Sequence, residues 1–131
     1  MAMPERTVLI IEDENNSIGI PPVFFSEAGY RVETSRRAAE GIERCRLLKP
    51  GVVVLDMLMP DMPGDETIRE LSQHTDTADI PVIVTLPPGF YPSGMAELKR
   101  MGRRVEVLKR PIDLRDLKKL IGAMAEDGGG R

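Results

Sequence analysis

The chain has 131 residues, of which 41% are hydrophobic and 30% charged, a composition that suits one globular domain and excludes a disordered or collagen-like chain. Its 18 basic and 21 acidic residues give a net charge of −3, which disfavours direct nucleic-acid binding, and its one cysteine, Cys45, cannot form an internal disulfide or a zinc site alone. No apolar run reaches the roughly 18 residues of a membrane span, and residues 1–6 lack the pattern of a signal peptide, so we expect a cytoplasmic protein that contacts no membrane.

Five short runs rich in β-branched residues predict strands. The first, third and fourth are almost continuously apolar, as in strands covered on both faces, whereas the second alternates with charge and should lie at a sheet edge. In chain order, the runs are Thr7–Ile11, Tyr30–Thr34, Val52–Leu55, Ile80–Thr85 and Val105–Leu108.

Segments between the later strands carry apolar residues at three- and four-residue spacing, which predicts amphipathic helices. Asp65, Ser93 and Asp113 are each placed to cap a helix start. The apolar positions are Ala38, Ile42 and Cys45; Ile68 and Leu71; Met95, Leu98 and Met101; and Leu114, Leu117, Ile121 and Met124.

The first helix is interrupted by two prolines, which predicts a late start near Pro21. Residues 15–20 should then form a long loop above the first strand. We expect Val23, Phe24 and Ala28 to pack inward from this short helix.

Regular alternation of strands and helices with right-handed crossovers predicts an α/β fold, a three-layer (βα)5 flavodoxin-like sandwich. Its five-stranded sheet should be parallel, in the order 2-1-3-4-5. Residues 1–126 should form this single domain, and the Gly-rich residues 127–131 a flexible tail.

Acidic residues follow two strands that this order makes neighbours. The first strand ends at Glu12 and Asp13, and the third ends at Asp56. Ligands of such sheets bind at the carboxyl ends of the strands, so we expect the three carboxylates to converge on one pocket. Oxygen-only ligands select a hard cation such as Mg²⁺, which points to phosphoryl chemistry.

From residue 7 to about residue 124 the chain resembles the receiver domains of bacterial two-component response regulators, which have the CheY-like form of this fold. The resemblance rests on the order and spacing of four segments. These are Val8–Glu14 with its acidic residues, Asp56–Gly64 with the pattern Asp-x-x-Met-Pro-x-x-x-Gly, the strand Pro81–Thr85, and Arg110–Leu114 with its basic-Pro-x-Asp pattern.

The resemblance implies that Asp56 accepts a phosphoryl group from a sensor histidine kinase or a phosphotransfer protein, in a phosphorelay and not as an enzyme. Thr85 and Arg110 would contact the transferred group. Glu12, Asp13 and Asp56, with the backbone carbonyl of Leu58, would hold Mg²⁺. Signalling would pass to a downstream protein partner, or through a homodimer, on the face formed by residues 95–101, the fifth strand and the last helix. The basic residues Lys99, Arg100, Arg103 and Arg104 lie in or beside that face.

The chain departs from the family at three positions. Arg110 stands where the family has lysine, with Lys109 one residue earlier. Because side chains alternate along a strand, Lys109 should point away if Arg110 points into the pocket. Val107 replaces a switch aromatic, and Leu86 replaces a small residue.

These departures keep an alternative open, in which the chain is a degenerate receiver that binds proteins without being phosphorylated. Two other classes fit the residues poorly. A flavodoxin-like electron carrier would have its flavin phosphate repelled by Glu12–Glu14. An aspartyl phosphatase would need a general acid where the chain has Leu58.

Overall fold

The computed structural model describes residues 6–14, 18–90, 96 and 104–129. It contains one parallel sheet in the order β2-β1-β3-β4-β5, which confirms the predicted topology. The strands are β1 (Arg6–Ile11), β2 (Tyr30–Ser35), β3 (Val52–Asp56), β4 (Val82–Leu86) and β5 (Val105–Lys109). The helices are α1 (Pro22–Glu27), α2 (Ala38–Leu48), α3 (Gly64–Gln73) and α5 (Leu114–Gly129).

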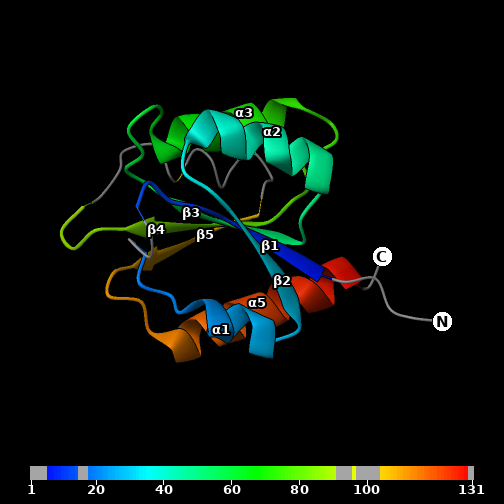
Figure 1. The fold of residues 1–131 in the computed structure, drawn as a ribbon, viewed down its shortest axis with the longest axis vertical. Helices are drawn as coiled ribbons and strands as arrows, with labels where there is room; N and C mark the ends of the chain where they lie inside the picture. The colour runs from blue at the N-terminus through cyan, green and yellow to red at the C-terminus, as the bar shows by residue number, and fades with distance from the viewer. Residues whose placement is uncertain (1–5, 15–17, 91–95, 97–103, 130–131) are drawn as a thin grey trace.

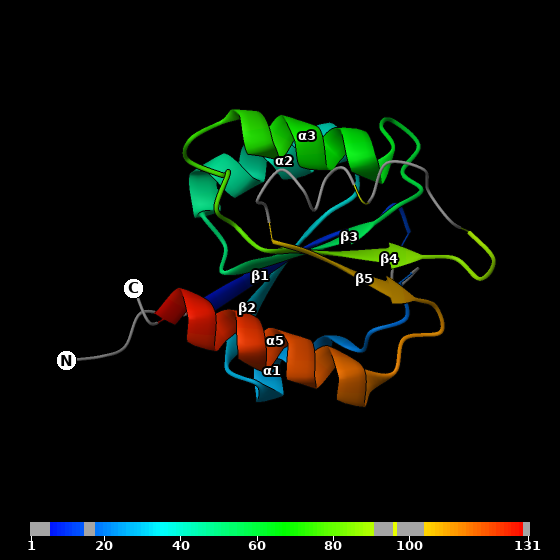
Figure 2. The ribbon, with the colours of Figure 1, turned by 180° about the vertical axis from the view of Figure 1, so that it is seen from behind.

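Helices cover both faces of the sheet. In Figures 1 and 2, α2 and α3 lie on one face, whereas α1 and α5 lie on the other. Alternate residues of the central strands therefore enter two separate cores. Leu9 and Leu55 pack on the α2/α3 side, and Ile10 and Val54 pack on the α1/α5 side. This double burial explains the almost continuous apolar sequence of β1, β3 and β4.

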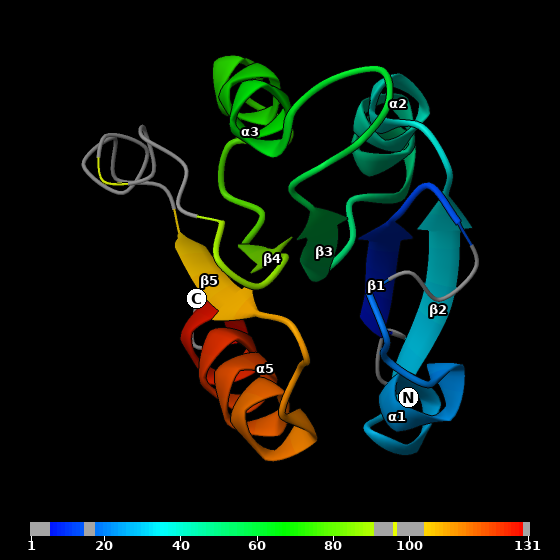
Figure 3. The same cartoon turned by 90° about the vertical axis from the view of Figure 1, so that its left-hand side faces the viewer.

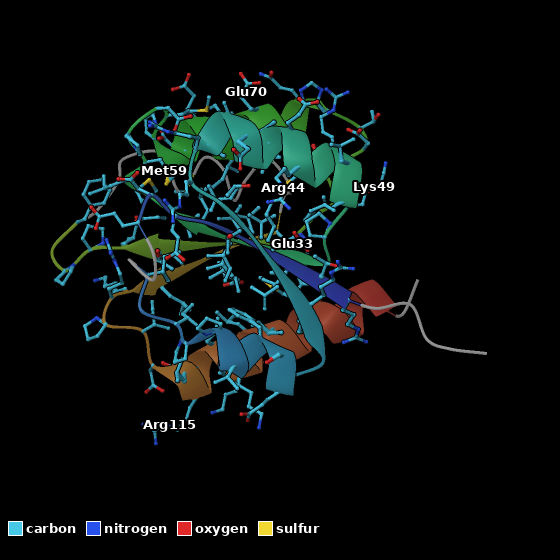
Figure 4. The ribbon with its side chains drawn as sticks, in the orientation of Figure 1. Glu33, Arg44, Lys49, Met59, Glu70 and Arg115 are labelled. Carbon is cyan, nitrogen blue, oxygen red and sulfur yellow. The ribbon has the colours of Figure 1, made fainter. Side chains whose placement is uncertain are left out.

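Strand β2 lies at one edge of the sheet, where Figure 3 shows it beside β1. An ion pair joins this edge to the helix above it, because Arg44 of α2 contacts the carboxylate of Glu33 at 2.5 Å. Figure 4 shows these two side chains between α2 and β2. Such a position explains the charged alternation of the strand, since Arg31 and Glu33 meet solvent and the Arg44 side chain instead of a second core.

Strand β4 begins later than predicted. Pro81 has no N–H group to donate to the ladder, and β4 starts at Val82 and continues through Leu86. Ile80 lies before the strand, yet it is buried in the α2/α3 core. Ile80 is apolar because it is buried, and the sequence pattern alone does not distinguish such a residue from a strand residue.

Helix α1 begins at Pro22, as the two prolines predicted, but its buried face differs from the prediction. Phe25 is fully buried, whereas Val23 is 54% exposed and Ala28 is also exposed. Phe24 is partly buried against the same core. A six-residue helix has less than two turns, so one aromatic anchor decides which side faces the sheet.

The three predicted caps have different outcomes. Asp113 precedes α5 and accepts the N–H of Arg115 at 2.9 Å, as expected for a cap. The prediction for Asp65 is wrong, because α3 begins one residue earlier, at Gly64, and Asp65 instead pairs with Arg69. Ser93 lies outside the described residues, as do Met95, Leu98 and Met101 of the expected fourth helix.

Helix α5 continues to Gly129, so residues 127–129, which we expected to begin a flexible tail, are helical. Cys45 is fully buried in the α2/α3 core, as expected of a packing residue. Within the described ranges, no helix is both long and apolar enough to cross a membrane.

Candidate functional site

The carboxyl edge of the sheet brings two of the candidate residues side by side. Asp56 is the last residue of β3, and its register partner in β4 is Thr85. The N–H of Met57 donates to the carbonyl of Thr85 at 3.0 Å, which fixes the strands at this point. Asp56 is 5% exposed and Thr85 is completely buried. The site is therefore centred on a nearly buried carboxylate at the end of the central strand.

Among the described residues, two groups contact the carboxylate of Asp56. The N–H of Leu58 donates to its Oδ1 at 3.1 Å, and Nη2 of Arg110 lies 3.7 Å from the same oxygen. Arg110 follows β5, where its N–H donates to the carbonyl of Leu86 at 2.8 Å. Lys109 is exposed, in keeping with the alternation of side chains that the sequence suggested. A guanidinium therefore compensates the charge of Asp56.

The hydroxyl of Thr85 is buried without a hydrogen-bond partner among the described residues. A buried hydroxyl in this condition is costly, and most buried polar atoms have a partner. Because Thr85 lies beside Asp56 in the ladder, its hydroxyl can serve an oxygen atom brought next to that carboxylate.

The three carboxylates that we expected to converge do not form one cluster among the described residues. In the part of the chain that the structure describes, no three side chains of aspartate, glutamate, histidine or cysteine form a group that could hold a metal ion. Glu12 Oε1 accepts the N–H of Ile18 at 3.0 Å, a contact with the loop that follows β1. Three carboxylates repel one another, and here Glu12 and Asp56 each have a separate donor.

Asp13 instead lines a shallow depression of about 380 Å³ together with the segment after β3. That segment, Met57–Pro63, carries the Leu58 carbonyl. Met57 and Met59 are largely buried in the α2/α3 core, while Leu58 is half exposed. Carboxylate and carbonyl oxygens at this rim suit Mg²⁺ in chemical type. Asp13, Asp56 and Leu58 are therefore the residues that could hold it.

Asp61 is a feature of the site that the sequence interpretation missed. Its carboxylate accepts the N–H of Ala38 at 2.9 Å and that of Ala39 at 3.0 Å, at the start of α2. Desolvation raises the pKa of Asp61, but these two hydrogen bonds and the charge of Arg37 outweigh it and hold the pKa below the ordinary value of 3.8. One signal for such a contact was available. Arg37, the N-cap residue of α2, has no side-chain acceptor for the N–H groups of the first turn.

The remaining departures from the family lie in the core beside the site. Leu86 is 3% exposed, and Val107 packs partly buried against the same cluster. Phe90, from the loop after β4, also packs partly buried on that cluster. Tyr91 and the basic residues Lys99, Arg100 and Arg103 lie outside the described residues.

Comparison with known proteins places these features in a family. Residues 8–121 match the sequence profile of the response regulator receiver domain. Protein PilH of Pseudomonas aeruginosa is 28% identical over 117 residues, which are 89% of this chain and 95% of PilH. The polar-differentiation response regulator DivK of Brucella anthropi is 24% identical over 109 residues, 83% of this chain and 87% of DivK.

Solved structures share the fold. Chemotaxis protein CheY4 of Vibrio cholerae superposes with a TM-score of 0.77 at 21% identity, covering 92% of this chain and 99% of CheY4. The receiver domain of a LuxO repressor protein from Vibrio parahaemolyticus gives a TM-score of 0.80 at 21% identity, covering 95% of this chain and 92% of that domain. With the profile match over most of its length, the chain belongs to the response regulator receiver domain family.

Proposed function

We propose that this receiver domain accepts a phosphoryl group on Asp56 from the phosphohistidine of a sensor histidine kinase or a phosphotransfer protein. The observation that carries the proposal is the pairing of Asp56 with Thr85 at the sheet edge. A nearly buried carboxylate lies beside a buried hydroxyl that has no hydrogen-bond partner among the described residues. Such a hydroxyl suits an incoming phosphoryl oxygen.

In the proposed reaction an Oδ atom of Asp56 attacks the phosphorus atom of the donor. The phosphorus–nitrogen bond breaks, and its electron pair returns to the imidazole, which takes a proton. The product is an acyl phosphate on Asp56. Thr85 would donate its hydroxyl to one phosphoryl oxygen, and Arg110 would neutralise part of the charge on the group.

Asp13, Asp56 and the carbonyl of Leu58 would hold Mg²⁺, which neutralises charge on the transferring group when it is bound. Asp13 and Leu58 line the same depression, and Leu58 also donates its N–H to Asp56, which supports this assignment. Glu12, whose carboxylate accepts the N–H of Ile18, would contribute its negative charge to the Mg²⁺ site.

The modified domain would act by protein contact and would not turn over a substrate as an enzyme. A downstream protein partner, or a second copy of the chain, would bind at the face that includes β5 and α5. The relatives PilH and DivK are matched over nearly their whole length, which agrees with a receiver that signals through such contacts.

The ion pair between Arg110 and Asp56 favours a second candidate function. A guanidinium that already compensates the acceptor could replace the cation and leave a domain that binds proteins without phosphorylation. In this alternative the fold is kept and the phosphoryl chemistry is lost.

Incubation with a small phosphoryl donor, with and without Mg²⁺, followed by intact-mass measurement, tests the proposal. We expect one phosphoryl group per chain, formed faster with Mg²⁺. If neither a small donor nor any histidine kinase modifies the chain while it still binds protein partners, the degenerate receiver is the correct account.

A further inference from the structure

The segment between β3 and α3 is closed at its base by a tight contact. The N–H of Gly64 donates to the carbonyl of Met57 at 2.8 Å. A Cβ atom on Gly64 would lie 3.0 Å from Cα of Met57 and 2.9 Å from its Sδ, so only glycine permits this approach. The base of the segment is therefore fixed next to Asp56.

The far end of the segment is fixed by a different element. Asp61 accepts the N–H groups of Ala38 and Ala39, which lie 23 and 22 residues earlier in the chain. Helix α2 has no side-chain cap of its own, because its N-cap is Arg37. The helix thus obtains its cap from the phosphoacceptor loop (residues 57–63), and the loop obtains an anchor from the helix.

Leu58 lies between these two anchors and contacts the proposed acceptor directly. Its N–H donates to Asp56 Oδ1 at 3.1 Å, and it lines the depression with Asp13. The direction of the Leu58 N–H and carbonyl therefore depends on how the loop is held at Gly64 and at Asp61.

We infer that Asp61 is a positioning residue, which fixes the phosphoacceptor loop on helix α2 and thereby sets the geometry of Leu58 toward Asp56 and a bound cation. The inference deepens the proposed function and rests on it for the role of the cation. Both carboxylate oxygens of Asp61 accept N–H groups of helix α2, so Asp61 acts through the loop that it anchors. Groups that orient metal ligands in this way change metal affinity by roughly 10- to 100-fold when they are removed.

The test must separate positioning from simple helix capping. Asp61→Ala removes both functions, whereas the double variant Asp61→Ala/Arg37→Ser returns a cap to α2 without returning the loop anchor. Arg37 has the extended backbone of an N-cap, with φ −132° and ψ 145°, so serine can accept from the first turn there. Asp65→Ala is the matched control, since Asp65 lies on α3 and contacts Arg69.

Two readouts apply to all variants: the dissociation constant of Mg²⁺ by calorimetry, and the amide hydrogen exchange of the phosphoacceptor loop at Leu58. We expect Asp61→Ala to weaken Mg²⁺ binding by roughly tenfold and to speed exchange at Leu58. In the double variant, Arg37→Ser should restore the melting temperature, while Mg²⁺ affinity and exchange at Leu58 should stay as in Asp61→Ala. Asp65→Ala should match the parent protein.

Recovery of Mg²⁺ affinity and exchange together with the melting temperature would show that Asp61 is only a helix cap and would overturn the inference. Unchanged readouts in Asp61→Ala would overturn it as well. If the parent protein does not bind Mg²⁺, the proposed function loses its cation, and exchange at Leu58 alone then decides whether Asp61 positions the loop.

Discussion

Arg110 Nη2 lies 3.7 Å from Asp56 Oδ1, and the two side chains are only 22% and 6% exposed. The pair joins β5 to the end of β3 across the intervening strand β4. A nearly buried carboxylate is costly without a partner, and the guanidinium supplies one. The same contact means that an incoming cation or phosphoryl group meets a carboxylate whose charge is already compensated.

Replacing Arg110 by lysine should favour activation. An ammonium is more compact than a planar guanidinium and reorients more easily onto a phosphoryl oxygen. We expect Arg110→Lys to tighten Mg²⁺ binding and to speed modification by a small donor roughly fivefold, or by ~1 kcal/mol in the barrier. Calorimetry and time-resolved intact-mass measurement check this.

Lys109→Arg is the matched control, because it makes the reverse exchange at the exposed neighbouring residue. This variant should leave Mg²⁺ binding and the rate of modification unchanged. A slower or unchanged Arg110→Lys variant would mean that arginine already serves the phosphoryl group adequately. Loss of modification in Arg110→Ala would then identify it as a ligand of that group.

Thr85→Val separates the chemistry of the hydroxyl from its packing. The Thr85 hydroxyl has no hydrogen-bond partner in the described part of the chain, so its removal should leave the free energy of unfolding unchanged or raise it by up to about 1 kcal/mol. Modification of Asp56 should slow by on the order of tenfold or more, because a donor to the phosphoryl group is lost. Chemical denaturation and intact-mass kinetics measure the two effects.

Thr77→Val is the counterpart at a fully buried threonine whose hydroxyl donates to the carbonyl of Leu71 at 2.6 Å. This variant should lose about 1–2 kcal/mol of unfolding free energy and keep the parent rate of modification. Equal rates in Thr85→Val and the parent would remove Thr85 from the proposed site.

Gly64→Ala should destabilise the protein, because the added methyl group would overlap Met57 at the base of the phosphoacceptor loop. Overpacking of this kind costs about 1–3 kcal/mol. Gly122→Ala is the matched control in α5, where a Cβ meets no atom within 4 Å. It should raise the unfolding free energy by roughly 0.5–1 kcal/mol through helix propensity. A neutral Gly64→Ala would contradict the tight approach.

Acid should weaken the contribution of Asp61 to stability. Its pKa in the folded protein lies below 3.8, so the stabilisation is present above pH 3.8 and is lost as pH falls through the lower folded value. Asp61→Ala should therefore cost ~1 kcal/mol near neutral pH, as for other helix caps, and progressively less below pH 3.8. Hydrogen bonds from Arg115 also lower the pKa of Asp113. This effect is the same in the parent and in Asp61→Ala, so it cancels in the difference between their unfolding free energies. A difference independent of pH would contradict the ionised cap.

Much of the fold follows from local patterns in the sequence. Charge alternation predicted β2 at an edge, and the sheet has the predicted order 2-1-3-4-5. The family resemblance singled out Thr85, which the structure pairs with Asp56 in the ladder. Glu12, Asp13 and Asp56 do not form one metal-binding group in the described residues, and the N–H of Ile18 captures one carboxylate oxygen of Glu12. That capture depends on loop geometry, which residue types alone do not determine.

Long-range capping was equally hidden from the sequence. Asp65 has the residue type and position of a cap, yet the helix start at Gly64 satisfies its own N–H through Met57. Asp61 caps a helix more than twenty residues earlier in the chain, a contact that only the folded structure brings together.

Modification of the parent protein and of Asp56→Asn by a small phosphoryl donor with Mg²⁺, compared by intact mass, tests the central claim most directly. The substitution keeps the shape of the side chain and removes the nucleophile. The account predicts one added phosphoryl group on the parent and on the control Asp65→Asn, and none on Asp56→Asn. Equal modification of Asp56→Asn and the parent would contradict it.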